Sequence, residues 1–227
     1  MKKFIFLFLV GQLFISCSSD SDSSGPTFSN TPQAKSQFDN KNYGIYKGVF
    51  VGSSGHVLIN IKNEGLVSAT LNIDGTVYNF TTTESVSEGI AISGLTFTSG
   101  GFLFDFNVNA DGSDPWISNI NILGHPNADM DILKELSTAL VMCYQGTYAG
   151  DDSGVFNMIT QSGEVYGLAM SGGDSESTYL EGLISGSAIT GEFWGGSFSG
   201  TINGNSVSGN WQNTSLESGT WSGVRTL

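Results

Sequence analysis

A short pattern of aromatic residues and glycines occurs twice in this chain of 227 residues. Each copy is followed by another glycine and an apolar stretch. Four pairs of positions match at one common offset of 98 residues: Tyr46/Tyr144, Gly48/Gly146, Phe50/Tyr148 and Gly52/Gly150. The common offset predicts two related β-modules of similar size.

The composition suits a chain of many short strands. Glycine is abundant, with 31 residues, proline is scarce, with 4, and 39% of the chain is hydrophobic. Such a chain is too apolar for disorder, and its glycines favour tight turns between strands. Short strands joined in this way form small closed barrels or sandwiches, because closure removes the edges along which sheets aggregate. We therefore expect an all-β protein.

The net charge excludes one class of partner. The formal charge is -13, and loss of the first 16 residues, which include Lys2 and Lys3, would bring it to about -15. A nucleic-acid-binding protein needs a basic patch to meet the phosphates, and only six basic residues would then remain. We expect no nucleic-acid partner. The acidic surface serves solubility, with weak divalent-cation binding as the alternative.

The first 16 residues have the features of a signal peptide: two lysines, an apolar run over 4–15 and a small residue before Cys17. The run is too short to remain as a membrane span. The segment Leu13–Cys17 resembles the lipobox of bacterial lipoproteins of the Bacteroidota type, although Phe14 stands where leucine is usual. The resemblance implies that Cys17 becomes the lipidated first residue of the mature protein. Ordinary secretion is the alternative.

Residues 17–42 are expected to form the lipidated cysteine and a disordered tether, because the serines and aspartates over 18–24 are polar and unpatterned. The acidic run directly after Cys17 also resembles the surface-export signal of Bacteroidota lipoproteins. That resemblance implies a place on the extracellular face of the outer membrane. The alternatives are a plain spacer, and a protein that faces the periplasm or is secreted.

The first β-module is expected over 43–126. One stretch alternates with the period of a half-buried strand, and its apolar members are Phe102, Phe104, Phe106 and Val108. A second such stretch carries Val57, Ile59 and Ile61. Asp74-Gly75 is a two-residue hairpin signal between two further strands.

Residues 127–142 are expected to form one helix that links the modules. His125-Pro126 breaks the preceding strand, and Asn127 or Asp129 can cap the helix. The apolar residues of the segment fall at helical spacing: Met130, Leu133, Leu136 and Leu140.

The second β-module is expected over 143–227, with Asn203-Gly204 as a type I′ hairpin turn. Its inward-facing positions include many glycines, which tightly coiled strands need where only a hydrogen atom fits. The strand rhythm and the glycine-rich composition resemble the barrel domains of surface lipoproteins of the transferrin-binding type, and loosely lipocalin-type barrels. No ligand residues follow from this resemblance.

Catalytic and metal sites find little support. Asn107–Gly112 matches the start of an EF-hand loop, but Ser118 stands where glutamate is needed, so we expect a β-turn. Asp151 and Asp152 are weak calcium candidates. The chain has only two histidines and no Gly-x-Ser-x-Gly motif. We expect no cofactor and no enzyme. Cys143 is expected to be a small buried apolar residue.

Ligand binding is the function that the sequence favours. Flat aromatic side chains stack on sugar rings and anchor interfaces. Trp116 and Trp194 are the candidates for exposed binding residues, and Trp221 shares a strand face with Arg225, which permits cation–π stacking. Trp211 is expected in the core.

We expect an outer-membrane lipoprotein that binds a glycan, a small ligand or a protein partner without catalysis. The alternatives are a structural or assembly accessory of an envelope complex and, third, a glycan-processing enzyme.

Overall fold

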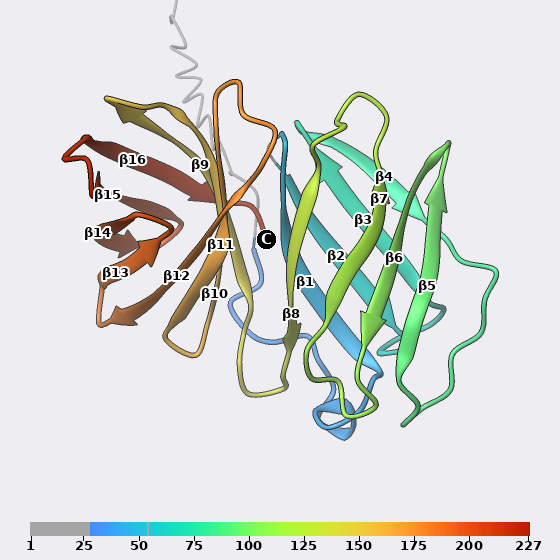
Figure 1. Ribbon diagram of the computed structural model, residues 1–227. Helices are drawn as coiled ribbons and strands as arrows, with labels where there is room; N and C mark the ends of the chain where they lie inside the picture. The colour runs from blue at the N-terminus through green and yellow to red at the C-terminus, as the bar shows by residue number, and fades with distance from the viewer. Residues whose placement is uncertain (1–27, 54) are drawn as a thin grey trace, which may run out of the picture.

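The computed structural model describes residues 28–53 and 55–227, so the predicted signal peptide and Cys17 lie outside the described residues. Two β-modules lie side by side (Figure 1). Within the described residues the regular structure consists of sixteen strands and one 3₁₀ turn, η1 (Ser36–Phe38). The prediction of an all-β protein is confirmed.

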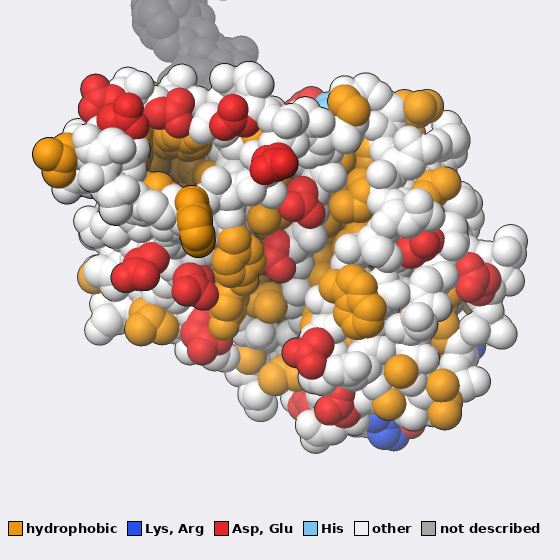
Figure 2. Space-filling model, in the orientation of Figure 1, with side chains coloured by type: hydrophobic (Ala, Val, Ile, Leu, Met, Phe, Trp, Pro, Cys, Tyr) orange, Lys and Arg blue, Asp and Glu red, His pale blue; other side chains and the backbone are white. Residues whose placement is uncertain are grey.

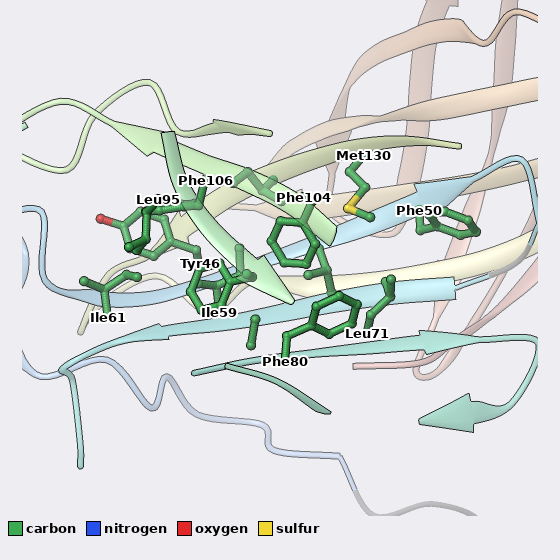
Figure 3. Packing of buried hydrophobic residues seen from close by; sticks show 14 of the residues in the cluster. Tyr46, Phe50, Ile59, Ile61, Leu71, Phe80, Leu95, Phe104, Phe106 and Met130 are labelled. Carbon is green, nitrogen blue, oxygen red and sulfur yellow. The ribbon is translucent and has the colours of Figure 1, made fainter. Parts of the chain in front are cut away.

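The first module contains two sheets with one hydrophobic core between them (Figure 3). Five strands form the larger sheet in the order β4-β3-β2-β1-β8, and three form the smaller sheet in the order β5-β6-β7. The bounds are β1 (Gly44–Val51), β2 (Gly55–Ile61), β3 (Ser68–Ile73), β4 (Thr76–Phe80), β5 (Ile92–Ser99), β6 (Phe102–Val108), β7 (Trp116–Asn121) and β8 (Asp129–Glu135).

The predicted alternation sets this core. Val57, Ile59 and Ile61 of β2 are fully buried, as are Phe104 and Phe106 of β6. Asp74-Gly75 is the two-residue turn between β3 and β4, because Ile73 pairs with Thr76. In both cases a local pattern in the sequence was sufficient to predict the local structure.

The predicted helix over 127–142 is wrong: β8 occupies its first half and pairs with β1 along its whole length. Met130 and Ile132 of β8 face the core of the first module, whereas Leu133 packs against the second module. Because the second module covers the outward face as well, that face also carries an apolar residue, Leu133, and Met130 and Leu133 fall at helical spacing by coincidence. The first module therefore extends to Glu135.

The second module is a closed eight-stranded antiparallel barrel in which β16 returns to pair with β9. Its strands are β9 (Met142–Gly150), β10 (Gly154–Gln161), β11 (Glu164–Ser171), β12 (Thr178–Ser185), β13 (Ala188–Phe193), β14 (Gly196–Asn203), β15 (Ser206–Asn213) and β16 (Ser218–Arg225). Asn203 pairs with Ser206, so the hairpin turn is Gly204-Asn205, one residue later than predicted.

The two modules share one strand order. In each, eight strands follow one another around the module, and the last strand lies beside the first (Figure 1). The first module differs because it is open at two places: β7 and β8 belong to different sheets, and β4 and β5 are joined only by the bridge between Thr81 and Thr98. The repeated motif forms β1 in one module and β9 in the other.

The modules pack through the outward face of β1 and β8 against β9, β10 and β11. Two apolar clusters cover this junction: Val49, Val141, Cys143 and Ile159 form one, and Val51, Leu168 and Met170 form the other. On the junction face of the first module, the ammonium group of Lys47 in β1 donates to Glu135 Oε2 of β8 at 2.5 Å, and both side chains are buried.

The predicted tether over 17–42 is wrong for its described part, residues 28–42. The backbone N–H of Gln33 donates to Glu135 Oε1 at 2.7 Å, and Lys134 Nζ donates to the carbonyl of Phe38 at 2.6 Å. Two charged side chains of β8, which is about 100 residues later in the chain, therefore hold the backbone of this segment in place. Polar composition alone did not reveal these partners.

Candidate functional site

One end of the barrel opens into a cavity of about 150 Å³. Four loops surround this mouth: 151–153, 172–177, 194–195 and 214–217. Figure 2 shows it at the upper left as a hollow with apolar walls. The walls are mainly aromatic: Tyr148, Phe156, Phe193, Phe198, Trp211 and Trp221. Barrel mouths are common ligand sites, and convergent aromatic side chains are what such sites require.

The glycines of the barrel make room for these rings. Trp211 lies directly opposite Gly219 on the next strand, where a Cβ would be only 2.6 Å from the indole nitrogen. Phe198 lies opposite Gly191 in the same way, with a Cβ distance of 2.2 Å. Each ring covers the backbone of a neighbouring strand instead of filling the middle of the barrel. The Gly/aromatic alternation of the sequence therefore encodes the wall of the cavity.

Polar groups gather on one side of the mouth. Ser171 Oγ donates to Asp152 Oδ2 at 2.8 Å, and the hydroxyl of Tyr148 lies 2.8 Å from Ser171 Oγ and 3.3 Å from Asp152 Oδ2. Burial raises the pKa of the Tyr148 phenol, and the charge of Asp152 acts in the same direction. Tyr148 is therefore a neutral hydroxyl near pH 7, next to a carboxylate.

The two indole groups of the cavity differ in their hydrogen bonding. Trp221 Nε1 donates to the carbonyl of Asn210 at 3.1 Å. The indole N–H of Trp211 is buried and has no partner among the described residues. Tyr148 and Trp211 meet edge to face, with ring centroids 5.9 Å apart. This contact fixes the polar side of the mouth against its aromatic wall.

The mouth carries many acidic residues. Three of its loops hold Asp151, Asp152, Asp174, Glu176 and Glu217. The fourth loop carries Trp194, whose side chain is 94% exposed. Acidic side chains surround the hollow in Figure 2. The residues that line the cavity include Asp152 and no Lys, Arg or His.

The structure brings some of the predicted site residues together and separates others. Trp194 stands at the rim of the mouth and Trp221 lies inside the cavity. Trp116 begins β7 of the first module and is about half exposed, away from this cavity. Trp211, predicted as core, is 8% exposed and lines the cavity wall.

Arg225 is at the other end of the barrel. Its guanidinium donates to Asn30 Oδ1 at 3.0 Å and to the carbonyl of Ser29 at 2.5 Å, and it lies over the ring of Phe28. Trp221 shares the inward face, but the ring that Arg225 stacks on is Phe28. Arg225 therefore fixes the segment before the first module, far from the mouth.

The two calcium candidates make different contacts. Asp151 Oδ2 accepts the backbone N–H of Ser218 at 2.9 Å, whereas Asp152 belongs to the cluster with Tyr148 and Ser171. Across residues 28–53 and 55–227, no group of three or more His, Cys, Asp or Glu side chains gathers in a way that could hold a metal ion.

Sequence reasoning missed Tyr148 and Ser171. Tyr148 belongs to the repeated motif. Its inward position could have been inferred because Gly146, Tyr148 and Gly150 share one face of the strand. Ser171 could not, because it meets Tyr148 only through the register of β9, β10 and β11.

A second hollow, of about 300 Å³, lies where the modules meet. Glycine and short side chains provide most of its wall, including Gly52, Gly124, Gly154 and Gly172. Although it is the larger space and is also lined by polar side chains such as His125, Asn127 and Asp174, it lacks the several aromatic rings of the barrel mouth. The barrel mouth is therefore the better candidate site.

No helix in the described part of the chain is both long and apolar enough to cross a membrane. No known protein-family model matches the chain, and no curated protein matches it in sequence.

Proposed function

We propose that the protein is a non-catalytic binding protein whose C-terminal barrel holds a small ligand in its mouth. The aromatic cavity carries this proposal, because its wall combines several aromatic rings with a small number of hydrogen-bonding groups. A cavity of about 150 Å³ is large enough for a group the size of benzene. It is smaller than the roughly 300–1,000 Å³ of sites for drug-sized molecules. It therefore accepts one ring or one compact end group, and the rest of the ligand extends past Trp194.

The acids of the cavity favour binding over glycoside hydrolysis. Hydrolysis of that kind uses two carboxylates on either side of the scissile bond. Asp152 is the one acid among the residues that line this cavity, and two hydroxyl groups already contact it. Asp151 is directed to the backbone of Ser218. Such a mouth can orient a ligand through Asp152 and Tyr148.

Binding is tested with the chain from Ser18 to Leu227. We expect a thermal-shift screen of monosaccharides, single-ring aromatics, short alcohols and compact amines to give at least one ligand. At 100 times its dissociation constant, a ligand adds about 2.7 kcal/mol to the free energy of unfolding. That gain raises the midpoint of a protein this size by roughly 5–10 °C.

Two variants locate the site. Trp194→Ala and Tyr148→Phe are expected to weaken binding of the ligand found, whereas Trp116→Phe, in the other module, leaves it unchanged. A screen without any shift would overturn the proposal, and so would a shift that all three variants retain. The accessory role in an envelope complex would then be the better explanation.

We also propose that lipid on Cys17 anchors this binding protein to the outer membrane, with the barrel facing outward. The proposal rests on the lipobox-like Leu13–Cys17 and the acidic run after it. In cells, Cys17→Ala is expected to abolish acylation and to release a soluble form. Protease added to intact cells should degrade the native protein. Unchanged membrane fractionation of the variant would contradict the anchor, and full protection from protease would contradict the outward face.

The two modules are proposed to be copies of one repeated unit. Supporting this, Gly48 and Gly146 have the same role: a Cβ on either would lie 2.2 Å from a carbonyl oxygen of the neighbouring strand, that of Asp131 in one module and Ser222 in the other. In each case the neighbour is the last strand of the module, β8 or β16. The closed copy has the cavity proposed for binding.

A further inference from the structure

We infer that the ligand of the barrel mouth is a compact organic cation, with a protonated or quaternary ammonium group held inside the aromatic cavity. This inference rests on the proposed function. The faces of aromatic rings attract cations, most strongly when the cation is removed from water and the ring is tryptophan. The cavity offers two tryptophans, Trp211 and Trp221, with further aromatic rings around them.

The distribution of charge supports a positive ligand. The barrel, from Met142 to Leu227, has eight acidic residues and one basic residue, Arg225. Five of those acids are in the loops of the mouth, whereas Arg225 is occupied at the opposite end by Ser29 and Asn30. A cleft lined by one sign of charge between apolar walls raises the local concentration of ligands of the opposite sign. An anion would be repelled from this mouth.

The chemistry of the wall excludes two other kinds of ligand. A bare metal ion needs several oxygen ligands, but Asp152 is the one carboxylate that lines the cavity. A sugar ring needs hydrogen-bonding partners around its whole edge, since buried polar groups that lack partners are costly. Most polar groups of this wall are already engaged. Tyr148, Ser171 and Asp152 bond to one another. Asn213 bonds to Ser215 and Glu217 of its own loop. Thr178 and the indole N–H of Trp211 are the remaining polar groups that line the cavity, too few for the edge of a sugar. An ammonium group on a short apolar body satisfies both the rings and the single carboxylate.

The cavity volume sets the size of this group. A space of about 150 Å³ holds a trimethylammonium group or a single protonated amine with a few carbon atoms. The rest of the molecule leaves through the mouth, where Trp194 is exposed. Free small amines and the headgroups of choline lipids share this chemistry, and the experiment separates these sources.

The test compares choline with 3,3-dimethylbutan-1-ol, which has the same shape with a neutral carbon atom in place of the nitrogen. Calorimetry on the Ser18–Leu227 chain at low salt is expected to give at least about tenfold tighter binding of choline. Added sodium chloride should weaken the binding of choline and not that of the alcohol. Binding of the protein to phosphatidylcholine vesicles, compared with binding to phosphatidylglycerol vesicles, decides whether the choline headgroup in a membrane is also bound.

Variants connect the preference to the site. Asp152→Asn is expected to reduce the ratio of choline affinity to alcohol affinity several-fold. Trp194→Ala is expected to weaken the binding of both compounds, because Trp194 meets the part of the ligand outside the cavity, which the two share. The matched control is Glu164→Gln, which removes the same charge from the opposite end of the barrel. It should leave the ratio unchanged. Both Asp152→Asn and Trp194→Ala alter groups at the rim, so folding can be confirmed by the unchanged near-ultraviolet spectrum of the buried tryptophans.

The outcomes separate the inference from the proposed function. Equal binding of choline and the alcohol would overturn the cation and leave a binding site for neutral ligands. Binding of a neutral ring compound from the screen without binding of choline would do the same. If Glu164→Gln lowers the ratio of choline affinity to alcohol affinity as much as Asp152→Asn does, the net charge of the barrel causes the preference, and the proposed site is overturned. If no compound binds, both the inference and the proposed function fail.

Discussion

Gly200 lies under the indole of Trp221: a methyl group at position 200 would be 2.5 Å from Cζ2 of that ring and 2.2 Å from the carbonyl oxygen of Ser208. Neither neighbour can move freely, because the ring is buried and the carbonyl belongs to the paired strand β15. We therefore predict that Gly200→Ala destabilises the protein by about 2 kcal/mol or more. The unfolding midpoint should fall by roughly 4–8 °C.

Gly172→Ala is the control for this substitution. Gly172 lies in a mouth loop, and a Cβ there would meet only the carbonyl oxygen of Ser153, at 3.5 Å. Its unfolding midpoint should stay within about 2 °C of the native value. If Gly200→Ala is equally harmless, the ring of Trp221 does not lie on β14 and the proposed wall of the cavity is wrong.

The buried ion pair between β1 and β8 provides a second prediction. Lys47 and Glu135 have side chains only 3% and 0% exposed, so removal of one partner leaves an unpaired charge in the interior. We predict that Lys47→Met costs about 3–5 kcal/mol in urea denaturation. The double variant Lys47→Met/Glu135→Gln should recover most of the loss, because the remaining groups are neutral.

The exposed pair Lys35–Glu64 is the comparison, with side chains 46% and 83% exposed. Lys35→Met should cost less than about 1 kcal/mol. A double variant of the buried pair that is no more stable than Lys47→Met would show that packing of the lysine chain, and not the unpaired charge, causes the loss.

The sequence was sufficient where one face of a strand meets the core and the other meets water. The alternation of Phe104 and Phe106 with polar neighbours and the turn at Asp74-Gly75 depend on nearby residues only. It was insufficient for β8, because that strand is buried on both sides and the identity of its second neighbour depends on how the modules pack. The eighth strand of the first module was therefore read as a helix.

The candidate site was predictable only in part. Exposure of Trp194 followed from its position before Gly195-Gly196. The meeting of Tyr148 with Ser171 depends on the register of three strands, which no local pattern reveals. The same limit explains why the contacts of Arg225 could not be predicted: its partners Ser29 and Asn30 are almost the whole chain away in sequence. Composition predicted small barrels or sandwiches, but only the closed barrel of the structure shows which aromatic rings share a cavity.

Cys143 can report whether the two modules separate. Its side chain is fully buried at their junction, the thiol donates to the carbonyl of Gly48 at 3.5 Å, and burial raises the pKa of the thiol to about 12. In the chain from Ser18 to Leu227 we predict that thiol reagents at pH 8 label Cys143 at least about a thousandfold more slowly than in denaturant. Fast labelling with an intact tryptophan spectrum would mean that the modules part while the barrel stays folded.

Asp131 provides a prediction about pH. It lies on the outward face of β8, one of its carboxylate oxygens is buried without a hydrogen-bond partner among the described residues, and Asp129 is close to it. Burial, and secondarily the charge of Asp129, raises the pKa of Asp131 to about 6, from 3.8. Burial raises the pKa of Tyr179 across the junction, and the charge of Asp131 acts in the same direction.

Because the pKa is raised in the folded state, the folded protein binds a proton more tightly than the unfolded chain between about pH 4 and pH 6. The contribution of Asp131 to stability therefore falls as the pH rises through this window, by roughly 1–3 kcal/mol. We predict that Asp131→Asn is more stable than the native protein at pH 7, and that this advantage disappears towards pH 4. Urea denaturation of both proteins across this range measures the difference between their free energies of unfolding. The contributions of the other carboxyl groups are the same in both proteins and cancel in this difference. Glu64→Gln, an exposed change of the same type, should give a nearly constant difference. A constant difference for Asp131→Asn as well would show that the pKa of Asp131 is the same in the folded and unfolded states, and would contradict the raised value.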